Sequence, residues 1–182
     1  MKNVEIKARC EPSQAQRIRS ILQDTADYRG EDRQRDTYFQ VTTGRLKLRQ
    51  GDIERALIQY DRPDRNGPKT SRYTLVPLTP PQDERTREAL ANSLGILAVV
   101  HKIRHIFYDE NVKFHVDFLE GLGHFVEIEV RDQEEAVEVE ALREQCEHHM
   151  RRFGIGPDAL VSVSYSDMIL ERMSSSLSNR IE

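Results

Sequence analysis

Residues 3–9 read Asn3-Val4-Glu5-Ile6-Lys7-Ala8-Arg9, and the alternation in this stretch decides the fold. Every second side chain from Val4 to Ala8 is apolar, and the residues between them are polar or charged. Successive side chains of a strand point to opposite faces, so this period of two predicts a strand with one apolar and one charged face.

Seven further strands are predicted downstream, where strand-forming runs lie between turn signals such as Thr43-Gly44 and Gly51-Asp52. Because the connections are short, the strands are expected to pair as an antiparallel meander. The predicted strands are Tyr28–Gln40, Arg45–Arg49, Ala56–Arg62, Thr70–Leu78, Leu97–Asp109, Val112–Glu120 and Gly123–Arg131.

Four helices are predicted around these strands. Pro12 suits a first helical turn, and an apolar stripe from Ala15 to Leu22 continues that helix to about Asp24. The others are predicted over Gln82–Leu94, Glu134–Phe153 and Leu160–Met173. Residues 1–173 are expected to form a single domain, and the polar tail 174–182 is expected to be disordered.

Composition narrows the class of protein. A length of 182 residues suits one core, and a net charge of −4 argues against a surface that binds nucleic acid throughout. Two distant cysteines, Cys10 and Cys146, give no disulfide framework or zinc motif, which fits a reducing cytoplasm. The longest apolar stretch, Leu94–Val100, is too short to span a membrane.

Charge is segregated along the chain and ordered within strands. From Arg45 to Arg72 the net charge is +4, and from Asp109 to Glu147 it is −10.

Any one charged strand face could simply meet water, as in many antiparallel sheets. Several strands carry same-sign pairs, however: Lys47 with Arg49, Lys102 with Arg104, and Glu127 with Glu129. If the sheet closes into a barrel with helices on its apolar face, these pairs line the interior.

Charges inside a barrel are costly without a ligand of opposite charge. Lys and Arg bind phosphoryl oxygens, whereas carboxylates bind Mg²⁺ or Mn²⁺, which prefer oxygen ligands. A triphosphate with a divalent cation satisfies both sets of side chains.

The motifs that carry a resemblance to a known family follow one another over most of residues 3–130. They are Asn3-Val4-Glu5-Ile6-Lys7, Asp36-Thr37-Tyr38-Phe39, Gly44-Arg45-Leu46-Lys47-Leu48-Arg49, Lys102-Ile103-Arg104, His115-Val116-Asp117 and the stretch Glu120–Glu129. Together they resemble the CYTH domains, or triphosphate tunnel metalloenzymes, which include class IV adenylyl cyclases and thiamine triphosphatases. The class IV adenylyl cyclase-like branch is the most similar.

The resemblance implies an α+β fold, a closed eight-stranded antiparallel β-barrel (the triphosphate tunnel) with flanking helices. It implies metal ligation by Glu5, Asp117, Glu127 and Glu129, with Mg²⁺ or Mn²⁺ as cofactor. Phosphate contacts are expected from Lys7, Lys47, Arg49, Lys102 and Arg104, with Arg72 as a further candidate. Tyr38 is the expected catalytic side chain, with Arg62 as its candidate partner.

Two positions depart from the family pattern. Asn3 stands where the opening motif has its first Glu, which predicts one metal or a weaker second one. Gln59 is taken as the counterpart of a lysine that pairs with the tyrosine in thiamine triphosphatases, and an amide cannot lower the pKa of Tyr38 by its charge.

The expected function is metal-dependent hydrolysis of an inorganic or organic triphosphate, with ATP, thiamine triphosphate or tripolyphosphate as candidate substrates. One alternative is a cyclase that makes cyclic AMP and pyrophosphate from ATP, and another is a non-catalytic polyphosphate or nucleotide sensor. An RNA-binding barrel would use Arg55 with Tyr60 and Tyr73, but the acidic composition disfavours nucleic acid. The helix predicted over Glu134–Phe153, which is acidic, could also help to form a homodimer.

Overall fold

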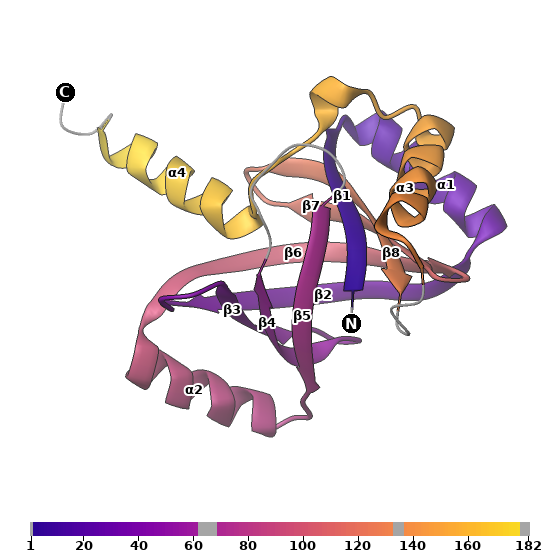
Figure 1. The fold of residues 1–182 in the computed structure, drawn as a ribbon. Coiled ribbons are helices and arrows are strands. Elements are labelled where there is room, and N and C mark those ends of the chain that lie inside the picture. The colour runs from indigo at the N-terminus through magenta and orange to yellow at the C-terminus, as the bar shows by residue number, and fades with distance from the viewer. Residues whose placement is uncertain (1, 62–68, 133–136, 179–182) are drawn as a thin grey trace.

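Eight antiparallel strands form the body of the protein (Figure 1). The computed structural model describes residues 2–61, 69–132 and 137–178. The strands are β1 (Lys2–Cys10), β2 (Asp27–Phe39), β3 (Arg45–Gln50), β4 (Arg55–Asp61), β5 (Lys69–Pro77), β6 (Ile96–Asp109), β7 (Val112–Leu119) and β8 (Gly123–Asp132). Each lies within one residue of its predicted ends, so the prediction of an α+β fold with eight antiparallel strands is confirmed.

Each strand pairs with two neighbours, in the order β1-β5-β4-β3-β2-β6-β7-β8. The pairing of β1 with β8 extends over all of Lys2–Cys10. On its other side, within the described part of the chain, β1 pairs with β5 over Lys2–Glu5, opposite Lys69–Arg72. The sheet therefore curves so far that its first strand meets both the fifth and the eighth.

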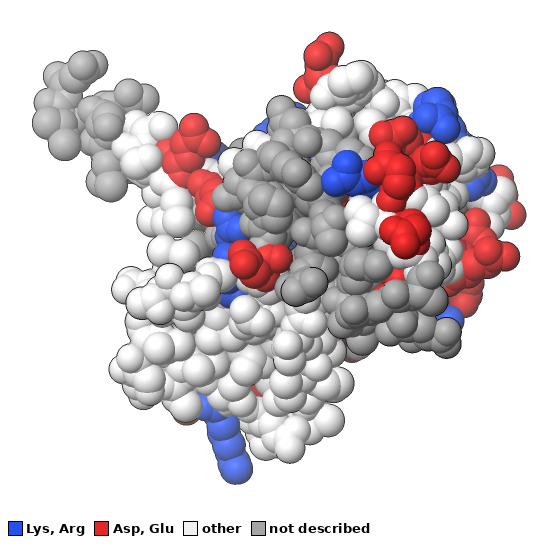
Figure 2. Space-filling model, viewed as in Figure 1, with Lys and Arg blue, Asp and Glu red and all other residues white. Residues whose placement is uncertain are grey.

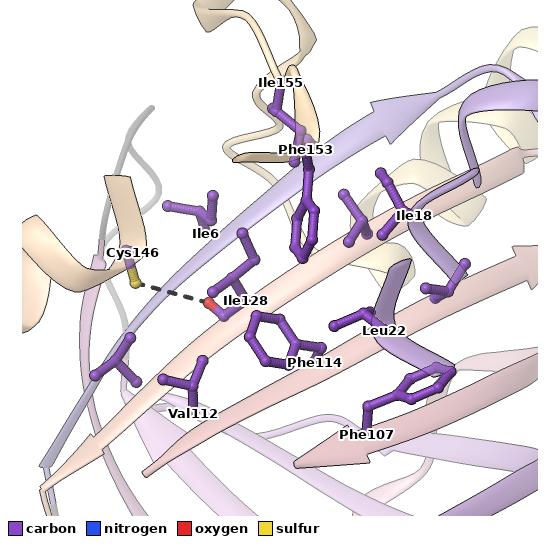
Figure 3. Packing of buried hydrophobic residues seen from close by; sticks show 14 of the residues in the cluster. Ile6, Ile18, Leu22, Phe107, Val112, Phe114, Ile128, Cys146, Phe153 and Ile155 are labelled. Atoms are coloured by element: carbon purple, nitrogen blue, oxygen red, sulfur yellow. Dashed lines mark hydrogen bonds between the residues drawn. The ribbon is translucent and has the colours of Figure 1, made fainter. Parts of the chain in front are cut away.

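The outer face of β1, β7 and β8 is apolar and covered by two helices, α1 (Pro12–Thr25) and α3 (Val139–Phe153). Figure 3 shows Ile18 and Leu22 of α1 and Phe153 at the end of α3 packed over the strands, beside Phe114. The Cys146 thiol of α3 also donates to the carbonyl oxygen of Val4, with Sγ at 3.4 Å. Because this face is fully occupied by apolar contacts, the alternating charged residues must lie on the inner face.

The C-terminal segments differ from the sequence prediction. Helix α3 begins at Val139 rather than Glu134; residues 133–136 lie outside the described part. The helix predicted from Leu160 begins at Tyr165 as α4 (Tyr165–Ser178), after a short 3-10 helix, η1 (Pro157–Ala159). The reason is that Leu160 bridges to Ala8 and the Val161 amide donates to the Lys7 carbonyl oxygen at 2.8 Å, which keeps this segment extended.

Helix α4 extends to Ser178, so residues 174–178 are helical where a disordered tail was predicted. Its first turn packs on the sheet through Tyr165 and Met168, and the rest projects away (Figure 1). The remaining helix, α2 (Gln82–Leu94), forms as predicted.

Asp and Glu side chains gather on the surface around α3 in Figure 2, which is drawn in the view of Figure 1. No helix in the described ranges is long and apolar enough to cross a membrane.

Replacing Phe114 by Ala should lower the free energy of unfolding by about 3–5 kcal/mol, because it empties a fully buried site between the sheet and α3. The matched control is Phe118→Ala on the same strand, where the side chain is 40% exposed and the expected loss is about 0.5 kcal/mol. Urea denaturation checks both; equal losses would contradict the assignment of the core to the outer face.

Candidate functional site

The inner face of the sheet lines a cavity of about 360 Å³. Its described lining residues include eight Lys or Arg and four Glu. The cations are Lys7, Lys47, Arg49, Arg55, Lys102, Arg104, Lys113 and Arg131, and the carboxylates are Glu5, Glu54, Glu127 and Glu129. The charged strand faces therefore point into a shared interior, as the alternation predicts.

Strand register sets which charges meet. On β1 and β8, Lys7 lies opposite Glu127 and Glu5 lies opposite Glu129. On β6 and β7, Arg104 lies opposite Asp117. Directly opposed residues of antiparallel strands have neighbouring side chains, so these pairings follow from the backbone alone.

Asp36 of β2 joins the basic side chains of two strands. Its Oδ2 accepts from Lys102 Nζ at 2.7 Å and from Lys47 Nζ at 3.2 Å, and its Oδ1 accepts from Arg49 Nε at 2.9 Å. Burial alone would raise the pKa of this carboxyl, but Arg49, Lys102 and Lys47 hold the pKa well below its usual range. Asp36 is thus a permanent counter-ion behind the cavity wall.

Arg104 is held by a second acidic group. Its Nε donates to Asp117 Oδ1 at 2.7 Å, and its Nη2 lies 2.6 Å from Glu127 Oε2. The Tyr165 hydroxyl of α4 donates to Asp117 Oδ2 at 2.8 Å, and Lys7 Nζ lies 3.4 Å from Glu127 Oε1. These contacts fix the guanidinium in one orientation at the cavity wall, and they occupy the oxygens of both carboxylates.

The four predicted metal ligands do not form one cluster. Within the described ranges no three His, Cys, Asp or Glu side chains are grouped so as to hold a metal ion. Asp117 is buried behind Arg104 and is absent from the described cavity lining, so the geometry gives its predicted metal role no support. Glu127 lines the cavity but is bound to Arg104, Lys7 and His115.

The end of the cavity at Glu5 and Glu129 fits a divalent cation better. These two carboxylates are directly opposed in register, and Asn3 lies beside them, its Nδ2 donating to Glu129 Oε1 at 2.8 Å. The Asn3 Oδ1 is buried and has no hydrogen-bond partner among the described residues. Mg²⁺ takes one or two carboxylates with waters and substrate phosphates, and amide oxygens suit hard cations, so this oxygen set matches the ion.

Several side chains in the site lie outside the predicted set of site residues, among them Glu54, His115 and Lys113. Glu54, in the β3–β4 turn, accepts from Arg49 Nη1 at 2.8 Å and also pairs with Lys113. His115 Nδ1 lies 3.1 Å from Glu127 Oε2, and burial together with Arg104 and Lys113 lowers the pKa of this imidazole to about 4. The sequence already places His115 on the same strand face as Asp117, and Lys113 could have been found by extending this period of two by one step. A turn residue such as Glu54 gives no such signal.

The predicted catalytic pair is only partly described. Tyr38 lines the cavity and is hydrogen-bonded to Tyr60; burial and the nearby Asp36 raise its pKa, so the phenol stays protonated. Arg62 lies outside the described residues, and the side chain of Arg72 also lies outside them.

Gln59, interpreted from the sequence as the counterpart of the family lysine, does not face Tyr38. Gln59 is exposed on the outer face, and the cavity-lining residue opposite Lys47 on β4 is Ile58. The RNA-binding alternative also loses its stacking residues, since Tyr60 is buried and Tyr73 lines the cavity.

The sequence matches the CYTH domain over residues 1–165, and the chain therefore belongs to the CYTH domain family. Comparison with curated proteins gives no match. Among solved structures, the PH1012 protein from Pyrococcus horikoshii OT3 has a TM-score of 0.71 at 20% identity, covering 91% of this chain and 98% of its own.

Two further structures share the fold. A putative adenylate cyclase from Vibrio parahaemolyticus has a TM-score of 0.70 at 18% identity, covering 92% of this chain and 97% of its own. HpAC1 from Hippeastrum, described as a putative adenylyl cyclase with a dominant triphosphatase activity, has a TM-score of 0.62 at 15% identity, covering 94% and 96%. The predicted family resemblance is confirmed.

Lys102 should give anion binding a characteristic pH dependence. Burial, with Arg49 and Arg104 nearby, lowers the pKa of Lys102 to about 7 against the opposing effect of Asp36. An anion in the cavity favours the ammonium form, so binding above pH 7 should take up a proton and weaken by up to about tenfold per pH unit. Calorimetry of diimidotriphosphate in buffers of different ionisation enthalpy measures the uptake, and Lys102→Met should abolish it. Equal uptake by the variant would contradict this role.

Proposed function

We propose that this chain is a divalent-metal-dependent enzyme that hydrolyses a triphosphate held in the inner cavity, with the ring of strands acting as a closed tunnel. The observation that carries the proposal is the convergence of Lys7, Lys47, Arg49, Lys102 and Arg104 on one cavity. These are the five side chains for which the family resemblance implies phosphate contacts.

A polyanion fits the charge balance of this cavity. The described lining carries twice as many Lys or Arg as Glu, and Asp36 and Asp117 compensate part of that excess from behind the wall. Phosphoryl oxygens can accept from the remaining N–H donors, with Arg in a bidentate fork and Lys as a point charge. A substrate with several adjacent phosphates meets more of these donors than a monophosphate does.

Glu5 and Glu129, with the Asn3 amide oxygen, would hold Mg²⁺ or Mn²⁺ at one end of the cavity. When bound, the ion supplies charge neutralisation at the phosphoryl oxygens. The chain itself orients the phosphates, since Arg104 is fixed by Asp117, and Lys47 and Arg49 are fixed by Asp36. Tyr38 stays protonated, because its pKa is raised, and it can therefore donate a hydrogen bond. A donor of this kind suits phosphoryl transfer, which depends mainly on positioning and electrostatic stabilisation.

Cyclisation of ATP to cyclic AMP and pyrophosphate is the second candidate, and the likeness to the putative adenylate cyclase of Vibrio parahaemolyticus favours it. A sensor without catalysis, which the departures from the family pattern at Asn3 and Gln59 would favour, is less well supported, because Gln59 faces away from the cavity.

The deciding experiment is phosphorus NMR of the protein with ATP, thiamine triphosphate or tripolyphosphate, each with Mg²⁺ or Mn²⁺. Release of orthophosphate supports hydrolysis, and cyclic AMP with pyrophosphate supports the cyclase. Binding without any product over hours would contradict both and favour the sensor.

Arg49→Ala should lower kcat/KM by about 100-fold or more, because it removes a fixed donor to the transferring phosphate. The matched control is Arg33→Ala on β2, where the side chain is 72% exposed and activity should be unchanged. A similar loss in both variants would argue against the inner cavity as the site.

Glu129→Ala should raise the Mg²⁺ concentration needed for half-maximal activity by about tenfold or more, since a metal ligand is lost. Glu120→Ala, an exposed carboxylate on the β7–β8 turn, provides the control and should leave the metal dependence unchanged. An unaltered metal titration for Glu129→Ala would remove Glu129 from the metal site.

A further inference from the structure

One carboxylate of the β3–β4 turn already occupies part of the cationic cluster. Glu54 Oε2 accepts a hydrogen bond from Arg49 Nη1 at 2.8 Å, and Glu54 Oε1 accepts one from Lys113 Nζ. Gln34 Nε2 also donates to Oε2, at 3.2 Å. Lys and Arg bind phosphoryl oxygens with the same donors, so the Glu54 carboxylate lies where part of an anionic ligand could bind.

Glu54 is placed differently from the two aspartates that hold the cations from behind. Asp36 and Asp117 are buried and absent from the described cavity lining, so a ligand in the cavity does not reach them. Glu54 lines the cavity, and its side chain is 22% exposed. An anion that enters the cavity can therefore compete with Glu54 for Arg49 and Lys113.

The backbone of the turn holds Glu54 at this position. The buried carboxylate of Asp32 accepts hydrogen bonds from the backbone N–H groups of Asp52 at 2.6 Å, Ile53 at 2.9 Å and Glu54 at 3.0 Å. At Gly51 a Cβ atom would lie 2.5 Å from Asp32 Oδ1, so only glycine fits this close approach. Because the backbone is fixed, the Glu54 carboxylate leaves the cations by rotation of its own side chain, and its effective concentration beside them is high.

The charge of Glu54 persists at neutral pH. Burial alone would raise the pKa of this carboxyl, but Arg49 and Lys113 hold the pKa below its usual range. An anion that binds Arg49 and Lys113 must displace this charge, so the contacts that the anion gains are offset by those that Glu54 loses. A phosphate chain that other cations of the cavity already hold has the local concentration needed to displace it.

We propose that Glu54 is an internal competing anion, which occupies Arg49 and Lys113 in the free protein and is displaced when a triphosphate binds. This inference rests on the proposed function of the cavity. Glu54 then lowers the affinity for the triphosphate and determines how tightly the site holds it. A residue that merely orients Arg49 and Lys113 toward the ligand would have the opposite effect, because its removal would weaken binding.

Calorimetry of diimidotriphosphate in Mg²⁺ tests the sign of this effect. Glu54→Gln should lower the Kd by at least about tenfold, because it removes the competing charge and keeps the size of the side chain. The matched control is Asp52→Asn, which removes the same charge from an exposed position of the same turn, outside the described cavity lining, and should leave the Kd unchanged. Glu54→Ala should also tighten binding, and it replaces the glutamine variant if that variant does not fold.

The outcomes separate this inference from the proposed function. If the probe binds the wild type and binds Glu54→Gln equally or more weakly, or if Glu54→Gln and Asp52→Asn behave alike, the competition is wrong and the triphosphate site stands. A higher Mg²⁺ requirement in Glu54→Gln would make Glu54 a metal ligand and would also overturn the inference. If the probe binds neither the wild type nor the variants, the proposed function fails and the inference fails with it.

Discussion

The ion pairs of Asp36 with Lys47, Arg49 and Lys102 are the interaction on which the inner face depends. Three cationic groups gathered in a poorly solvated interior repel one another and lose their hydration, which would favour deprotonation or an open sheet. A single buried carboxylate accepts a hydrogen bond from each of them. Asp117 does the same for Arg104, which lies two residues from Lys102 on β6. Asp36 thus favours the charged forms of these groups and holds them toward the cavity before any anion enters, although burial still lowers the pKa of Lys102 to about 7.

Burial of the apolar outer face supplies the stability that offsets the cost of the charged inner face. Apolar side chains of β1, β7 and β8 pack under α1 and α3, and their burial is the favourable term that holds charged residues of the same strands inward. Alternate residues of one strand therefore serve different ends: one side chain packs in the apolar core, and the next faces the cavity. Substitutions on the two faces should have separable effects on unfolding and on ligand affinity.

Sequence patterns could predict the strands and the inward charges because β1, β3, β6 and β8 alternate clearly. They could not assign Asp36 a role, because β2 carries charges on both faces: Arg33 and Arg35 point outward while Asp36 points inward, and strand pairing is needed to tell them apart. The error at Gln59 has the same origin, since a shift of one residue moves a side chain to the opposite face. Glu54 and Ile53 lie in a turn, where no periodicity exists, and their place in the site depends on the distant carboxylate of Asp32.

The opposed cations and carboxylates on the inner face should select ligands by the number of linked phosphates. The most direct measurement is equilibrium binding of orthophosphate, pyrophosphate and diimidotriphosphate to the protein in Mg²⁺, compared at one ionic strength. Affinity should rise steeply with each added phosphate, because each reaches a further fixed Lys or Arg. Equal affinities for the three anions, or no binding by any of them, would contradict a triphosphate site in this cavity.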